Sequence, residues 1–241
     1  MKIAIISDIH GNLEALETVL SHINKQKVDK IVCLGDIVGY GSNPNECAEI
    51  IREKCQLALA GNHDFAAADK TDISYFNPYA KEAVMWTRRK LTPENLEYIS
   101  NLPLDYYEEE RIFVHAIPSN PGSWGYIMSN MEASREFRFF AHKVCFVGHS
   151  HSPVVIEYKD NRCKFIRRPE FHFEDDKRYI VNVGSVGQPR DGDPKACYIT
   201  YDVDSRYVQY YRLKYDLETT QKKIHLAGLP KNLANRLEFG R

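Results

Sequence analysis

Apolar runs and amphipathic segments alternate along the first part of the chain. Residues 2–7 form an isoleucine-rich run of strand length, and apolar side chains recur at helical spacing across 12–26. Asn43-Pro44 has the residue types of a helix N-cap and first helical position, and the helix is expected to run to about Lys54. Further strands are predicted at 30–34 and 56–60, and further helices at 78–90 and 93–100. This alternation is typical of an α/β protein.

Strand-like patterns dominate the rest of the chain. Strands are predicted at 105–109, 111–115, 144–148, 153–159, 162–167, 178–183, 196–202 and 206–213. A helix is predicted at 131–141, and two terminal helices at about 216–226 and 231–238. The sequence contains no internal repeat and no low-complexity tract. We therefore expect one α/β domain over residues 1–241, in which helices cover two packed sheets.

Composition and charge exclude several classes of protein. Hydrophobic residues make up 43% of the chain and aromatic residues 12%, which excludes a disordered protein. With 33 acidic and 32 basic residues, the formal charge of −1 argues against a protein held on nucleic acid by excess positive charge. No apolar run reaches the roughly 20 residues of a membrane span, and none has the form of a signal peptide. We expect a cytoplasmic protein without a membrane partner.

Metal-binding residue types follow five of the predicted strands. They occur in Asp8-Ile9-His10, Gly35-Asp36, Gly61-Asn62-His63-Asp64, His115 and Gly148-His149-Ser150-His151. In α/β sheets, ligands gather beyond the carboxyl ends of the strands, so loops there can converge on one point. Residues i and i+2 of an extended segment point to the same side, so the Asp-x-His and His-x-His pairs are each expected to aim both side chains at one site.

Together these loops offer seven metal donors. They are Asp8, His10, Asp36, Asn62, His115, His149 and His151. Seven donors exceed the needs of one tetrahedral zinc and suit two metals roughly 3.5–4 Å apart. Mixed imidazole and carboxylate ligands favour Mn, Fe, Zn, Co or Ni. Each motif taken alone has an ordinary structural alternative, such as a helix cap for Asp8 or a turn for Gly35-Asp36. Their joint occurrence at strand ends favours the metal site.

The five motifs resemble the signature of the calcineurin-like metallophosphoesterase superfamily, and the resemblance runs from Met1 to about Tyr201. The stretches DIHGNLEAL, LGDIVGYGSNPNEC, AGNHD and NVGSVGQPRDGDP are similar to a bacterial and archaeal subgroup related to diadenosine tetraphosphatases. The resemblance implies a four-layer α/β/β/α sandwich of two mixed sheets. It assigns Asp8, His10 and His151 to a first metal, Asn62, His115 and His149 to a second, and Asp36 to both. It also implies that His63 is a catalytic residue that protonates the leaving group.

Two departures from the family pattern bear on the substrate. Related Ser/Thr phosphatases and symmetrical dinucleoside tetraphosphatases continue the second motif as Asp-x-x-Asp-Arg-Gly, whereas this chain has Gly39 and Tyr40 at the Asp and Arg positions. Ala60 replaces a second arginine before the third motif. An aromatic ring cannot bind phosphate oxygens through paired N–H groups as an arginine side chain does. The sequence therefore favours a protein phosphatase less. His63 is left without an identified orienting carboxylate.

The resulting expectation is a phosphoesterase that hydrolyses a phosphate ester or anhydride of a small molecule by attack of a metal-bridging hydroxide. Asn62 would help to hold the phosphate oxygens. Arg190 in the glycine-containing loop 184–190 would add a positive charge, the alternative being a structural salt bridge. Dinucleoside polyphosphates, other nucleotides and phosphodiesters are candidate substrates. A nuclease, a protein phosphatase and a non-catalytic binding scaffold are the alternatives, and the oligomeric state is left open.

Overall fold

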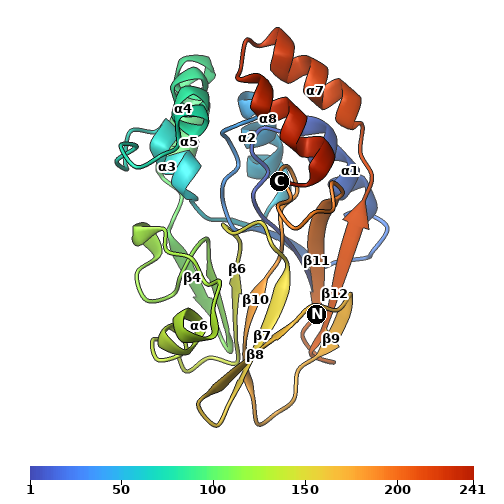
Figure 1. Cartoon of the computed structure of the whole chain (residues 1–241). Coiled ribbons are helices and arrows are strands. Elements are labelled where there is room, and N and C mark those ends of the chain that lie inside the picture. Colours follow the sequence, from blue (N-terminus) through green and yellow to red (C-terminus); the bar gives the residue numbers. More distant parts are fainter.

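Two six-stranded mixed sheets form the centre of the molecule in a computed structural model that describes all 241 residues (Figure 1). The first sheet has the order β3-β2-β1-β11-β12-β9, with β1 (Lys2–Ile6), β2 (Lys30–Cys33), β3 (Leu57–Ala58), β9 (Glu170–His172), β11 (Ala196–Asp202) and β12 (Tyr207–Leu213). The second has the order β4-β5-β6-β10-β7-β8, with β4 (Asp105–Glu108), β5 (Arg111–Val114), β6 (Val144–Val147), β7 (Val154–Lys159), β8 (Arg162–Ile166) and β10 (Arg178–Asn182).

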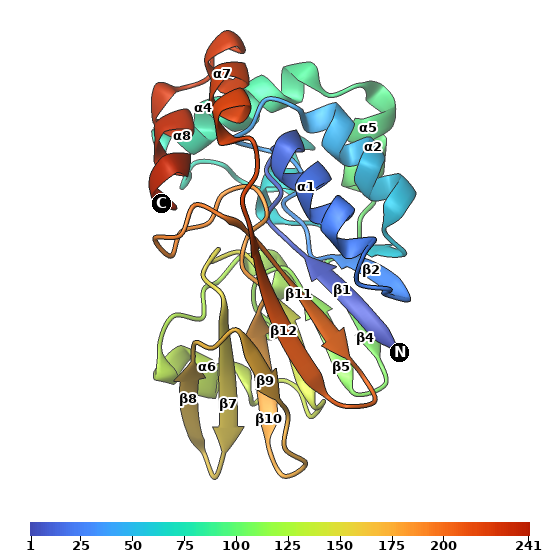
Figure 2. The ribbon, with the colours of Figure 1, turned by 90° about the vertical axis from the view of Figure 1, so that its right-hand side faces the viewer.

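Helices connect and cover these strands (Figure 2). They are α1 (Leu13–Ile23), α2 (Pro44–Lys54), α3 (Asn62–Ala67), α4 (Pro78–Lys90), α5 (Pro93–Ser100), α6 (Asn130–Glu136), α7 (Leu217–Leu226), α8 (Lys231–Asn235) and the short 3₁₀ helices η1 (Pro121–Ser123) and η2 (Arg236–Phe239). None of them combines the length and hydropathy that a membrane-spanning helix needs.

Three hydrophobic layers hold the four structural layers together. One core packs α1, α2 and α5 on the outer face of the first sheet, with Leu16 and Ile51 fully buried. A second lies between the sheets and joins Ile5 to Phe146. A third packs α6 on the outer face of the second sheet around Phe137. This arrangement confirms the expected α/β/β/α sandwich and explains why the inner strands are apolar on both faces.

Most predicted elements agree with the structure, but some short ones differ. The strand expected at 56–60 is reduced to the two residues of β3, and the helix expected at 131–141 ends at Glu136. Helix α3, which begins at Asn62, and the strand β9 were not predicted. The last predicted helix divides into α8 and η2. These elements are short, so whether they form depends more on contacts with neighbouring elements than on their own hydrophobic periodicity.

Parallel pairing brings the carboxyl ends of the relevant strands together. β1 pairs with β2 and β2 with β3 in parallel, while β5 pairs with β6 in parallel in the other sheet. The loops that follow these five strands therefore leave at the same edge of the sandwich, below the helices drawn at the top of Figure 1. Four of the five motifs lie in these loops, and the third runs from its loop into the first turn of α3.

Candidate metal centre

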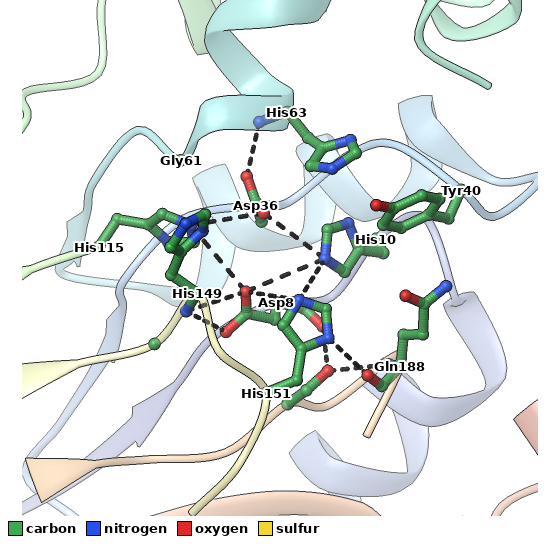
Figure 3. A network of polar contacts seen from close by, with 12 residues as sticks. Asp8, His10, Asp36, Tyr40, Gly61, His63, His115, His149, His151 and Gln188 are labelled. Atoms are coloured by element: carbon green, nitrogen blue, oxygen red, sulfur yellow. Dashed lines mark hydrogen bonds and ion pairs between the residues drawn. The ribbon is translucent and has the colours of Figure 1, made fainter. Parts of the chain in front are cut away.

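Six carboxylate and imidazole side chains form two adjoining clusters at this edge. Asp8, His10, Asp36 and His151 make up one, and Asp36, His115 and His149 the other. Within each cluster, one donor atom from every residue lies within 4.8 Å of all the others. All six side chains are buried, and Asp36 is the member that the clusters share (Figure 3). The structure thus brings together six of the seven predicted donors, and Asn62 is buried beside them in the wall of one cavity.

Backbone carbonyls fix the tautomer of every histidine in the clusters. Nδ1 of His10, His115 and His151 lies 3.3, 3.0 and 2.5 Å from the carbonyl oxygens of Val38, Leu34 and Gln188, and Nε2 of His149 lies 3.0 Å from that of Trp124. A carbonyl only accepts hydrogen bonds, so the ring nitrogen facing it carries the hydrogen. The other nitrogen then presents a lone pair, which is how ligating histidines are commonly oriented.

The clusters contain more acceptors than donors. Nε2 of His115 and Oδ1 of Asn62 are buried without any hydrogen-bond partner. Nε2 of His10 and Nε2 of His151 face each other at 3.1 Å although both rings already carry their hydrogen on Nδ1. Asp8 Oδ1 lies a further 3.2 Å from Nε2 of His151. Such a concentration of lone pairs needs cations, and imidazole with carboxylate is a donor set suited to divalent transition metals.

Burial and the two carboxylates shift the pKa values of the four histidines in different directions. Burial opposes a charged ring, yet the carboxylates of Asp36 and Asp8 outweigh it and raise the pKa of His115 to about 9. Burial lowers the pKa of His149 to about 3 and also lowers the pKa of His10 and His151. A proton on His115 can therefore partly compensate the carboxylates, while the other three rings stay neutral and available as ligands.

The loops that carry the candidate metal ligands contain residues in the left-handed backbone conformation. The φ angles are 55° at Asp8, 51° at His10, 51° at Asp36, 63° at His149 and 56° at His151. The expectation that the two paired motifs are extended is therefore wrong. The loops instead turn sharply after each strand, a conformation that Asp and His tolerate better than most residues but at a cost. Strained residues of this kind persist where the surrounding structure and a function require them.

Asp36 also fixes the helix that carries the third motif. Its Oδ1 accepts a hydrogen bond from the backbone N–H of His63 at 2.8 Å, while its Oδ2 lies 3.5 Å from His10 Nε2 and 3.4 Å from His115 Nε2. Asp64 accepts hydrogen bonds from the N–H groups of Gly61 and Val38 at 2.9 and 3.1 Å. The second and third loops are thereby joined, with the side chains of Asn62 and His63 directed into the same cavity.

His63 is held by aromatic packing. Its ring centroid lies 4.4 Å from that of Tyr40, 5.2 Å from that of Phe76 and 4.9 Å from that of His10. Its Nδ1 is buried without a hydrogen-bond partner, and the neighbouring Asp64 accepts hydrogen bonds from backbone groups. Burial lowers the pKa of His63 to about 4, so the ring is neutral near neutral pH.

Arg190, which the sequence predicts to add a positive charge near the site, lies in the wall of the cavity. The cavity has a volume of about 410 Å³ and is lined by Asn62, His63, Tyr40 and Arg190 among others. Arg190 donates to the side-chain oxygen of Gln188 at 2.8 Å and approaches Tyr40 Oη at 3.4 Å. It makes no ion pair with a carboxylate, so the alternative of a structural salt bridge does not describe it.

The sequence did not reveal the residues that orient the histidines. Trp124 and Gln188 act through their backbone carbonyls, which carry no signature in a side-chain sequence. Tyr126 stacks on His149 with centroids 4.2 Å apart and planes inclined by 22°. Its position in a loop, 23 residues before His149 (149 − 126), gives no indication of this contact.

Comparisons with known proteins agree with the fold and with the family suggested by the motifs. A family model of the calcineurin-like phosphoesterase superfamily domain matches residues 1–206. The chain therefore belongs to the calcineurin-like phosphoesterase superfamily, which confirms the resemblance seen in the motifs. It is 42% identical over 243 residues to the uncharacterised protein MJ0912 of Methanocaldococcus jannaschii, covering 99% of this chain and 98% of that protein.

Solved structures extend the comparison. A metallophosphoesterase from Sphaerobacter thermophilus is 39% identical and superposes with a TM-score of 0.89, covering 100% of this chain and 99% of that one. The hypothetical protein PH1004 of Pyrococcus horikoshii OT3 is 21% identical and has a TM-score of 0.83; the match covers 100% of this chain and 98% of that one. A putative diadenosine tetraphosphatase is 16% identical and has a TM-score of 0.55; the match covers 88% of this chain and 94% of that one. The last two show similarity of fold alone.

Proposed function

We propose that the protein is a bimetal-dependent phosphoesterase that hydrolyses a phosphate ester or anhydride bond of a small molecule. The observation that carries the proposal is the set of four buried histidines, each of which has one ring nitrogen against a backbone carbonyl and belongs to a cluster that contains Asp36. Buried polar groups normally have hydrogen-bond partners, so a purely structural role does not explain four buried rings whose remaining nitrogens face other acceptors.

The two clusters suggest how the ligands are divided. Asp8, His10 and His151 would hold one metal, Asn62, His115 and His149 the other, and Asp36 both. Mn, Fe, Zn, Co and Ni suit this donor set. When bound, such metals polarise a phosphate and make water nucleophilic at neutral pH.

The remaining polar residues of the cavity can act on the phosphate directly. The side-chain amide of Asn62 and the guanidinium of Arg190, both in the cavity wall, would contact non-bridging oxygens as negative charge develops. His63 is neutral in the free protein because burial lowers its pKa to about 4. An anionic phosphate beside the ring would favour its protonated form, which can then give its proton to the leaving oxygen.

The size and the lining of the cavity support a small substrate. About 410 Å³ is room for one small organic group, and aromatic rings including Tyr75, Trp124 and Tyr126 line it. Tyr40 stands where related protein phosphatases have an arginine, and its ring packs on His10 and His63. Nucleotides, dinucleoside polyphosphates and aryl phosphodiesters are therefore the substrates to try first.

Metal analysis combined with a substrate panel tests the proposal. Metal-free protein is reconstituted with Mn, Co, Ni, Fe or Zn and assayed on a diadenosine polyphosphate, a bis-aryl phosphodiester and an aryl phosphomonoester. We expect Asp36→Asn to lose metal and turnover, whereas Asp69→Asn, an exposed control in an ion pair with Arg88, keeps both. Normal turnover with full metal content in the Asp36 variant would refute the bimetal assignment. Metal binding without turnover of any substrate would favour the binding scaffold.

A further inference from the structure

One side of the cavity is aromatic and contains no candidate metal ligand of its own. Trp124 and Tyr126 come from the segment before α6, and Tyr75 comes from the segment between α3 and α4. The indole N–H of Trp124 donates to Thr71 Oγ1 at 3.1 Å, which joins the two segments, and both lie on the left of Figure 1. The aromatic side is thus built from two parts of the chain that are distant in the sequence.

The ring of Tyr126 has one face covered and the rest free. It stacks on His149 with centroids 4.2 Å apart and planes inclined by 22°, so the imidazole covers one face. Tyr126 is nevertheless 47% exposed and lines the cavity. The exposed area belongs to the edge and the other face of the ring, because His149 occupies the first. A planar group on that surface would stand one ring away from a candidate metal ligand.

Trp124 holds this part of the wall in place. Its carbonyl oxygen lies 3.0 Å from Nε2 of His149, while its indole N–H is bonded to Thr71. Its φ of 56° is a left-handed conformation, which a bulky residue keeps only where the surrounding structure imposes it. A platform that is already ordered loses little conformational entropy when a ligand stacks on it.

Tyr75 adds a second ring that the protein itself hardly uses. It is 93% exposed although it lines the cavity, so almost none of its ring area is buried in packing. Large apolar side chains left open to water in a cavity mark sites where a ligand covers them. Aromatic rings cover one another favourably, by loss of apolar surface to water and by stacking.

The charges of the cavity indicate which part of a substrate lies on the aromatic side. The Arg190 guanidinium lies 5.7 Å from the ring centroid of Tyr40. Asp72 also lines the cavity, and it follows Thr71, the partner of Trp124, so its carboxylate belongs to the aromatic side. A carboxylate repels phosphate, so a phosphate ester is expected to turn its uncharged group toward this side.

We propose that Tyr126, together with Tyr75, forms a stacking seat for a planar aromatic group of the substrate, either the base of a nucleotide or the ring of an aryl ester. This inference rests on the proposed function and narrows its substrates to esters and anhydrides that carry such a group. Tyr126 is then a residue that determines specificity and takes no part in bond cleavage.

Equilibrium binding to the metal-loaded protein tests the seat without requiring turnover. Calorimetry compares adenosine monophosphate with ribose 5-phosphate, which lacks the base, and phenyl phosphate with cyclohexyl phosphate, whose ring is not planar. Each compound is analysed after the titration to exclude hydrolysis as the source of heat. The wild-type protein is expected to bind the planar member of at least one pair about tenfold or more tightly, as base–aromatic stacking does elsewhere. The pair that shows the preference distinguishes a base from an aryl ring.

Variants assign the preference to the seat. Tyr126→Leu should lose most of it, and Tyr126→Phe, which keeps the ring, should retain it. Tyr106→Leu is the matched control, since Tyr106 is 42% exposed on β4 and lies outside the cavity wall. Metal content is measured in each variant because Tyr126 contacts His149. If Tyr126→Leu loses metal, the comparison passes to Tyr75→Leu, which should also reduce the preference.

Equal binding within both pairs of compounds would overturn the inference. So would a preference that survives in both Tyr126→Leu and Tyr75→Leu, or one that falls equally in Tyr106→Leu. If planar compounds are preferred but no compound in the substrate panel is hydrolysed, the proposed function fails while the seat stands.

Discussion

Gly39 lies directly against the imidazole of His63, so closely that a Cβ atom on Gly39 would stand 2.6 Å from Nδ1 of the ring. This is the position at which related phosphatases carry the aspartate that orients the histidine. The ring here occupies the space that such a side chain would need, and Tyr40 and Phe76 pack around it. We infer that packing replaces the carboxylate in holding His63.

The first prediction concerns this contact. Gly39→Ala should displace His63 and lower kcat by roughly ten- to a hundredfold, because misplacing a catalytic group by about 1 Å has effects of that size. Metal content should not change. Gly39 has φ +95°, so the substitution also strains the backbone. Gly228→Ala is the matched control, since Gly228 has φ +71° and no atom within 4 Å of the added Cβ. Equal losses of kcat in the two variants would mean that contact with His63 is unimportant.

The second prediction separates the two metal positions. His10 belongs only to the first cluster and His115 only to the second, so His10→Gln and His115→Gln should each reduce the metal content from about two ions per chain to about one. Metal analysis of the purified variants measures this. His22→Gln, which alters a partly buried histidine bonded to Tyr198, should leave the metal content unchanged. Loss of all metal in both cluster variants would indicate one indivisible site.

The third prediction concerns the connection between the second and third loops. Asp64→Asn leaves one buried N–H, of Gly61 or Val38, without an acceptor, because an amide has a single acceptor oxygen. The free energy of unfolding should fall by about 1–3 kcal/mol. Asp72→Asn is the matched control, since Asp72 also accepts two hydrogen bonds but is exposed. Thermal or urea unfolding of both variants gives the comparison, and a similar small loss in each would contradict the prediction.

The fourth prediction is a dependence of stability on pH in the metal-free protein. Burial lowers the pKa of His63 from 6.5 to about 4, so between these values the unfolded chain binds a proton that the folded chain does not. Stability must therefore fall as the pH falls through this range. Between pH 6.5 and pH 4, the free energy of unfolding of His63→Gln should fall by about 2 kcal/mol less than that of the wild-type protein. His172→Gln, at an exposed position on β9, should retain the wild-type slope in urea titrations.

The sequence by itself determined the sandwich and the identity of the donors. Apolar runs such as residues 2–7 have only one stable environment, a sheet covered on both faces, and polar motifs at their ends must meet where parallel strands finish. The family resemblance of these motifs is what assigns Asp36 and His115 to one metal, although 79 positions separate them (115 − 36). These inferences depend on side-chain type and order along the chain, which the sequence records in full.

Only the tertiary structure decided how those donors are held. The left-handed backbone at Asp8 and His151 opposes the local preference of the chain and persists because the surrounding loops enforce it. The tautomer of His149 depends on the carbonyl of Trp124, a group that every residue possesses and that no sequence pattern marks. The packing of Leu233 and Leu237 against Tyr40 is likewise a long-range contact, which local periodicity does not encode.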